Sequence, residues 1–115
     1  MRGPLTIAVA QPVCVSFDVA ANAAVHAATV RSSGARVVVF PEMSLTGYEL
    51  DAPPINPEDA RLAPIVAACA EAGALALVGA PVQGDGSEAY IATIAIDADG
   101  ARVAYRKVWL GGDEP

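Results

Sequence analysis

Residues 37–42 read Val37-Val38-Val39-Phe40-Pro41-Glu42, an apolar run that ends on a carboxylate. A short, unbroken apolar run is typical of a β-strand buried on both faces of a parallel sheet. In open α/β sheets the ligand crevice lies at the carboxyl ends of such strands. The sequence therefore predicts that Glu42 lies where an acid can do chemistry. The alternative interpretation is a carboxylate that only meets solvent where the strand ends.

Chain length and charge restrict the classes of protein to consider. With 115 residues the chain is one domain or part of one, long enough for a modest core. The net charge is -6 with only 7 lysines and arginines. Neither nucleic acid nor an anionic membrane surface attracts such a chain electrostatically. We therefore expect no nucleic-acid partner and no membrane partner.

The cysteines and the apolar segments indicate a cytoplasmic protein. Cys14 and Cys69 lack CxxC spacing, and the chain has one histidine, which argues against structural zinc and against a disulfide scaffold. The apolar segment at residues 5–10 is too short for a signal peptide. The longer one at 65–82 is interrupted by Glu71, Gly73 and Pro81, as a helix followed by a strand would be.

The order of expected elements is β-α-β-α-β-β-β, an α/β fold. We expect strands at residues 5–10, 36–40, 74–82, 90–96 and 102–108, and helices at residues 19–33 and 58–72. Asp18 is a plausible N-cap for the first helix, and Gly34 ends it. The compact strand-helix-strand unit implies that the first two strands pair in parallel. An Asp-Gly step at residues 99–100 predicts a hairpin between the last two strands.

Arg106 and Lys107 are neighbours near the end of the last expected strand. Neighbouring side chains on a strand point to opposite faces, so one cation can face inward. Lys107, the only lysine of the chain, would then be a natural partner for Glu42, because a buried charge is tolerated only when it is paired. A surface lysine is the alternative.

Several motifs occur in a fixed order along the chain. They are Ile7-Ala8-Val9-Ala10-Gln11, Asn22, Phe40-Pro41-Glu42 with Leu45-Thr46-Gly47-Tyr48, Gly79 at the end of the third strand, and Tyr105-Arg106-Lys107. The ordered set resembles the nitrilase, or carbon-nitrogen hydrolase, superfamily over essentially the whole chain. The resemblance implies an α-β-β-α sandwich, of which residues 1–115 are an incomplete amino-terminal part, truncated before the nucleophilic cysteine.

The resemblance also implies roles for individual residues. Glu42 would be the general base, Lys107 would stabilise the oxyanion, and Glu114 is a candidate second glutamate. Tyr48 either lines the substrate pocket or packs under its loop. Trp109 stands where the family more often has histidine, which affects the expected substrate contacts near that strand end.

The chemistry that the resemblance implies needs no metal and no organic cofactor. A thiolate attacks the carbon of an amide, a nitrile or a carbamoyl group, and a carboxylate takes the thiol proton. A fixed cation then stabilises the charge that develops in the tetrahedral state. Nitrilase, amidase and carbamoylase reactions share this core, so the class of small-molecule substrate stays open among the three.

Neither cysteine of the chain is a good candidate for the nucleophile. Cys14 follows the first strand, but a loop thiol near a site is commoner than a displaced nucleophile, and Cys69 reads as a small buried hydrophobic residue. We therefore expect the isolated chain not to hydrolyse amides or nitriles. We also expect its apolar sheet surface to promote self-association, consistent with a homodimer.

Two other functional classes remain. The chain could be a non-catalytic binding or assembly module, or a truncated subunit, derived from the same fold. A nucleotide-binding Rossmann-type domain is a weaker alternative, because residues 11–18 contain no glycine for a phosphate-binding loop.

Other polar residues have structural interpretations. His26 is expected to pack on the apolar face of the first helix together with Val19, Ala23 and Val30. Glu58 and Asp59 are expected to provide negative charge at a helix N-terminus, and not to bind a metal.

Overall fold

The computed structural model describes residues 6–47, 52–83 and 89–108. In chain order the elements are β1 (Ile7–Val9), α1 (Val19–Ser33), β2 (Val37–Val39), the 3-10 helix η1 (Ala60–Leu62), α2 (Ala63–Ala72), β3 (Leu75–Gln83), β4 (Ala89–Asp97) and β5 (Gly100–Val108). The predicted β-α-β-α-β-β-β order is confirmed. The predicted helix at 58–72 is divided into η1 and α2, with Pro64 in the first turn of α2.

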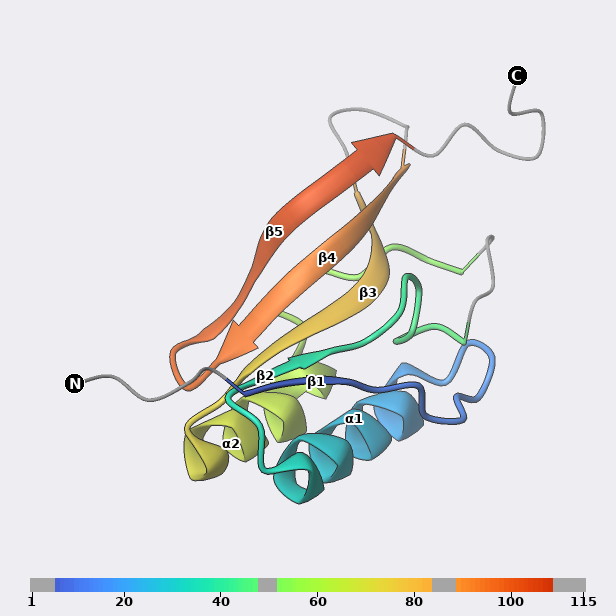
Figure 1. Ribbon diagram of the computed structural model, residues 1–115. Helices are drawn as coiled ribbons and strands as arrows, with labels where there is room; N and C mark the ends of the chain where they lie inside the picture. Colours follow the sequence, from blue (N-terminus) through green and yellow to red (C-terminus); the bar gives the residue numbers. More distant parts are fainter. Residues whose placement is uncertain (1–5, 48–51, 84–88, 109–115) are drawn as a thin grey trace.

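All five strands form one sheet in the order β1-β2-β3-β4-β5. The pair β1–β2 is parallel, as expected, and so is the pair β2–β3. The pairs β3–β4 and β4–β5 are antiparallel. Both helices pack side by side against the same face of the sheet (Figure 1). We call this the helix-side face, and we call the opposite one, to which Ile7, Val9 and Leu77 belong, the far face.

The burial of β3 follows from this arrangement. Its residues Ala76, Val78 and Ala80 are all fully buried on the helix-side face, while Leu75 and Leu77 on the far face are partly exposed. At the edge of the sheet, Val9 of β1 is 84% exposed. The prediction that residues 37–42 form a strand buried on both faces is therefore wrong for β2. Val38 is buried, but Val37 and Val39 are only partly buried, because the helices of this chain cover one face only.

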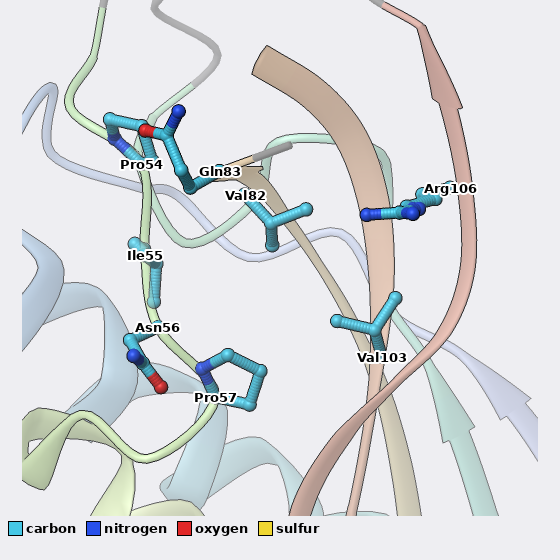
Figure 2. Close-up of a pocket in the computed structure, with 8 residues that line it drawn as sticks. All are labelled: Pro54, Ile55, Asn56, Pro57, Val82, Gln83, Val103 and Arg106. Carbon is cyan, nitrogen blue, oxygen red and sulfur yellow. The ribbon is translucent and has the colours of Figure 1, made fainter. Parts of the chain in front are cut away.

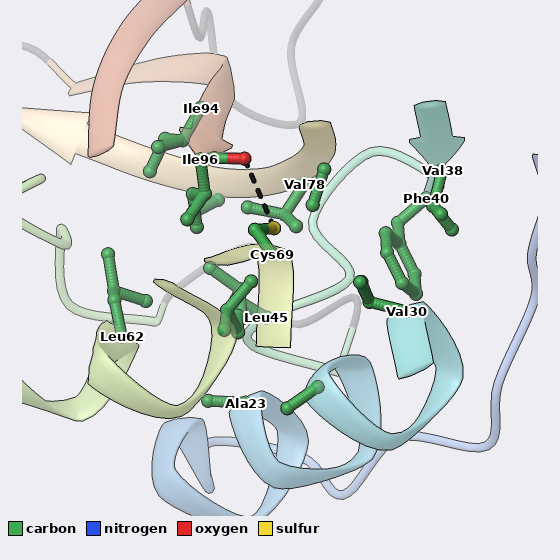
Figure 3. Close-up of a cluster of buried hydrophobic side chains, with 14 of the residues drawn as sticks. Ala23, Val30, Val38, Phe40, Leu45, Leu62, Cys69, Val78, Ile94 and Ile96 are labelled. Atoms are coloured by element: carbon green, nitrogen blue, oxygen red, sulfur yellow. Dashed lines mark hydrogen bonds between the residues drawn. The ribbon is translucent and has the colours of Figure 1, made fainter. Parts of the chain in front are cut away.

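The hydrophobic core lies between the helices and the helix-side face (Figure 3). Phe40 and Val38 pack near Val30 of α1, and Ile94 and Ile96 of β4 lie on the side of α2. Alanines such as Ala23 and Ala68 let the helices approach the sheet closely.

Local signals in the sequence explain where the helices begin and end. The Asp18 side chain accepts a hydrogen bond from the backbone N–H of Ala21 (3.0 Å), which confirms it as the N-cap of α1. Gly34 ends that helix in the left-handed conformation, with φ of 68°. Asp59 caps η1 by accepting from the N–H of Arg61, so its role at a helix N-terminus is confirmed.

Within the described ranges, neither helix has the length and apolarity that a membrane span requires. Among the predicted site residues, Tyr48 and Glu114 lie outside the described residues, and so does Trp109.

Candidate functional site

The segment that follows β2 continues alongside β3 past the end of β2. Three backbone N–H groups donate to the carbonyls of every second residue along the edge of β3 that faces β2. They are Phe40 to Leu77 (2.8 Å), Leu45 to Gly79 (2.9 Å) and Ile55 to Pro81 (2.7 Å). These bonds satisfy an edge of β3 that the short strand β2 leaves open. As a result, residues 41–47 are held against the middle of the sheet.

Gly79 is the point of closest approach. A Cβ atom at Gly79 would collide with the backbone N of Met43 and the backbone O of Pro41, and would lie 2.7 Å from the carbonyl carbon of Glu42. Only glycine lets the turn pass so close to the strand. Gly79 lies in the middle of β3, so its predicted place at the end of the third strand is wrong; the strand continues to Gln83.

The turn has an unusual backbone at the residue after the acid. Met43 has φ of 61°, in the left-handed region, although it is not a glycine. Its carbonyl accepts both the N–H of Thr46 (3.1 Å) and the Thr46 hydroxyl (3.2 Å). These bonds and the contact with Gly79 hold a conformation that an isolated chain would rarely adopt.

A buried relay of hydrogen bonds fixes the turn from the helix side. The Ser44 Oγ accepts the backbone N–H of Gly79 (3.2 Å) and lies 2.8 Å from His26 Nε2. His26 Nδ1 lies 2.6 Å from the carbonyl oxygen of Asn22, which can only accept. The Nδ1 atom therefore carries a proton and donates to this carbonyl. In the neutral imidazole, which burial favours, Nε2 has no proton and the Ser44 hydroxyl donates to it.

His26 is fully buried and its ring stacks on Phe40, with ring centroids 4.2 Å apart. Burial lowers its pKa to about 4, an effect only partly offset by the hydrogen bond to the Asn22 carbonyl. The expectation that His26 packs on the apolar face of its helix is confirmed, and its role is to position the turn.

Asn22 ties together the loops that follow β1 and β2. Its side-chain NH2 group donates to the carbonyls of Val15 (2.7 Å) and Leu45 (2.9 Å), and its Oδ1 accepts the N–H of Val15 (2.6 Å). Sequence reasoning assigned no role to Asn22 or Ser44. The available signal was two polar residues, Asn22 and His26, four positions apart on an apolar helix face, since buried polar groups need partners.

Glu42 itself is exposed, at the carboxyl end of β2. The Cβ direction at Gly79 is that of the far face, so the backbone of Glu42 passes over that face. The acid is therefore presented to solvent between the partly buried Pro41 and the buried Met43.

A register shift in β5 decides whether Arg106 or Lys107 pairs with Ile91, a far-face position of β4. We call residues that pair across neighbouring strands a row. In β4–β5, Ile94 pairs with Val103 but Thr93 pairs with Tyr105, so β5 contains one extra residue there. Beyond the shift Ile91 pairs with Lys107, and Ile91 also pairs with Pro81 of β3. Without the extra residue, Arg106 would occupy the Ile91 row.

The two cysteines differ in position. Cys69 is buried on α2, where its thiol donates to the Ile96 carbonyl (3.3 Å), and burial raises its pKa. It lies on the helix side of the sheet, beside Ile96 and Val78 (Figure 3). Cys14 is partly buried in the loop after β1, and its Sγ lies 3.5 Å from the Pro12 carbonyl. Over the described ranges, no cluster of three His, Cys, Asp or Glu side chains could hold a metal ion.

Comparison with models of known families identifies one family. A model of the family described as carbon-nitrogen hydrolase matches residues 6–114. Among solved structures, the chain is similar to a glutamine-dependent NAD(+) synthetase from Cytophaga hutchinsonii, with a TM-score of 0.61, 15% sequence identity and coverage of 94% of this chain. The match covers only 20% of that chain, and at this identity the likeness is one of fold. No curated protein matches.

We expect Gly79→Ala to lower the free energy of unfolding by about 3 kcal/mol, because the new methyl group meets backbone atoms that cannot rotate away. Gly73→Ala is the matched control. Gly73 also has a positive φ, but nothing lies within 4 Å of a Cβ there, so we expect a loss of only about 1 kcal/mol. Urea denaturation measures both, and equal losses would contradict the proposed close approach.

We expect the free energy of unfolding to decrease as the pH is lowered, because of His26, the only histidine of the chain. Its pKa is about 4 when folded, against an ordinary value of 6.5. Between pH 7 and 5 the unfolded chain therefore binds a proton that the folded chain does not, and the free energy of unfolding falls by about 2 kcal/mol. Denaturation at both pH values should show this loss in the native chain and a much smaller one in His26→Gln. The same slope in both proteins would show that His26 is not the group responsible.

Proposed function

Because this chain belongs to the carbon-nitrogen hydrolase family, we propose that it provides the general base and the oxyanion-stabilising lysine of a hydrolase that cleaves amide, nitrile or carbamoyl C–N bonds. The observation that carries the proposal is the exposed Glu42 on a turn locked over Gly79. A catalytic acid needs such a fixed position, because misplacement by even a small distance costs rate.

Glu42 acts as the base in this proposal. Its carboxylate takes the proton of the attacking thiol, returns it to the departing ammonia or amine, and then activates the water that hydrolyses the thioester. Support comes from the place of Glu42 at the carboxyl end of a central parallel strand, where ligands bind in open α/β sheets.

Lys107 acts on the charge that develops on the substrate. An ammonium fixed in a dry site stabilises the tetrahedral oxyanion far more than it would in water. Support comes from the register, in which Lys107 shares a row with Ile91 and Pro81, next to the row of Gly79.

The nucleophilic thiol comes, in this proposal, from polypeptide outside these 115 residues. Cys69 is on the wrong side of the sheet, and its raised pKa disfavours the thiolate. The chain spans about a fifth of the length of the synthetase that it resembles in fold, which leaves room for such a contribution.

The test is complementation. The 115-residue chain is mixed with a separately expressed carboxyl-terminal part of a carbon-nitrogen hydrolase that carries the family cysteine, and ammonia release is measured from amides, nitriles and N-carbamoyl compounds. We expect release by the mixture and none by the chain alone. Glu42→Gln should reduce the rate by about 100-fold or more, since general-base catalysis typically contributes that much. Lys107→Gln should have a similar effect.

Glu58→Gln is the control for charge, because Glu58 is an exposed carboxylate near η1, and we expect it to leave the rate unchanged. Ammonia release by the isolated chain, or an undiminished rate in Glu42→Gln, would overturn the assignment.

Self-association is the alternative role, and one observation favours it. The far face and the adjoining edge expose large apolar side chains, among them Ile7 (56%), Val9 (84%) and Tyr105 (65%). Exposed apolar patches of this kind mark association surfaces. A chain of this kind would act as an assembly module whether or not it takes part in catalysis.

We expect the native chain to associate with rising concentration, and Val9→Lys to weaken this association, because a charge would have to be desolvated at the contact. Val25→Lys, on the exposed side of α1, is the matched control and should associate as the native chain does. Light scattering coupled to size-exclusion chromatography measures the mass. Equal masses for the native chain and Val9→Lys at every concentration would remove β1 from the interface.

A further inference from the structure

A pocket opens on the helix-side face, away from Glu42. It lies between the loop at residues 54–57 and the ends of β3 and β5, and has a volume of about 310 Å³ (Figure 2). Volumes of this size are at the lower end of the range for small-molecule sites. None of the roles proposed above uses it.

The walls of the pocket are mostly apolar. Ile55 and Val82 are buried, with 2% and 3% of their surface exposed, while Val103 of β5 is 39% exposed and faces them across the opening. Pro54 and Pro57 complete the wall on the loop side and stiffen it, because proline fixes its own φ. The pocket is therefore largely preformed.

Arg106 is the charged group of the pocket. The register shift in β5 places it in the row of Ala92, on the helix-side face, and its side chain extends toward Val82 in Figure 2. The guanidinium carbon lies 4.2 Å from the centre of the Tyr90 ring. Stacking on an aromatic face orients the guanidinium and leaves its N–H groups at the edge available to an acceptor.

Arg106 also differs in charge pairing from three other arginines of the chain. Arg31, Arg61 and Arg102 each form an ion pair with a carboxylate, at 2.9, 2.6 and 3.1 Å. Arg106 makes no such pair with any residue in the described ranges. An oriented cation beside apolar walls is the arrangement that a carboxylate with an apolar body would satisfy.

Asn56 offers a second polar contact at the pocket. Its Oδ1 accepts the backbone N–H of Glu58 (2.8 Å), which fixes the amide plane. The NH2 group of the same amide is a donor, and so adds to the preference for an acceptor ligand.

We propose that this pocket binds a short-chain monocarboxylate, with the carboxylate on the guanidinium of Arg106 and the alkyl chain against Ile55, Val82 and Val103. The site is on the opposite side of the sheet from Glu42 and does not depend on catalysis. Amides of the same chain length lack the negative charge and bind more weakly.

Hexanoate and hexanamide are the probes, and binding to the 115-residue chain is measured by calorimetry and by methyl NMR. We expect hexanoate to bind about tenfold more tightly than hexanamide, because the charge-assisted hydrogen bonds are lost in the amide. Methyl shifts should be confined to Ile55, Val82 and Val103, with Val30 and Val38 in the core unchanged. Absence of hexanoate binding, or equal affinity for the two probes, would overturn the proposal.

Arg106→Gln should weaken hexanoate binding by about tenfold and remove the preference over hexanamide. Arg102→Gln is the matched control. Arg102 is a cation of the same strand but already pairs with Asp97, so its removal should change neither the hexanoate affinity nor the preference over hexanamide. Val103→Phe is an independent variant that fills the pocket and leaves the charge in place, and it should weaken both probes. Full hexanoate affinity in Arg106→Gln or in Val103→Phe would contradict the assigned site.

Discussion

The close passage of residues 41–43 over Gly79 is the constraint on which the rest of the structure depends. It requires glycine at one position of β3 and a left-handed residue at Met43. It also requires a buried hydrogen-bond relay from Ser44 through His26 to the Asn22 carbonyl. The left-handed backbone at Met43 is unfavourable by itself. Together, the glycine and the hydrogen bonds hold the turn in this single conformation. Glu42 is exposed on this turn, and Met43, Ser44, Leu45 and Thr46 that follow it are buried.

A second constraint acts at the other end of the sheet. One extra residue in β5 shifts its pairing with β4 by one position beyond Thr93. It puts Arg106 in the row of Ala92, beside the pocket on the helix-side face, and Lys107 in the row of Ile91. Two adjacent cations thereby occupy neighbouring positions in the register and, in our proposals, serve different tasks.

The elements of the fold were predictable because their signals are local. Asp18, Gly34 and the Asp-Gly step at 99–100 fix ends and turns through their own backbone chemistry, and the structure places each where the sequence indicates. The one-sided burial of β2 was not predictable, because apolar valines read the same whether one face or both are covered. The position of Gly79 was also given wrongly, as the end of the third strand, although the strand expected at 74–82 already continued past it, as β3 does.

The candidate site was predictable only in part. Glu42 stays a prediction, made because an acid that follows an apolar run is conspicuous. Ser44 gave no local signal, because its contact with Gly79 is long-range. Asn22 had a signal that was not used, its spacing of four positions from His26. The register shift in β5 has no signal in residues 102–108 that a single sequence reveals. Only the structure therefore shows that Lys107, and not Arg106, is in the row of Ile91.

The most direct test of the account is the distance between the Glu42 carboxylate and the Lys107 Nζ in a crystal structure of this chain. The account predicts that both groups lie over the far face, within about 6 Å of one another, a range at which opposite charges shift each other's protonation. A lysine that points to the helix-side face, or lies more than about 10 Å from the carboxylate, beyond the reach of unscreened attraction, would contradict it.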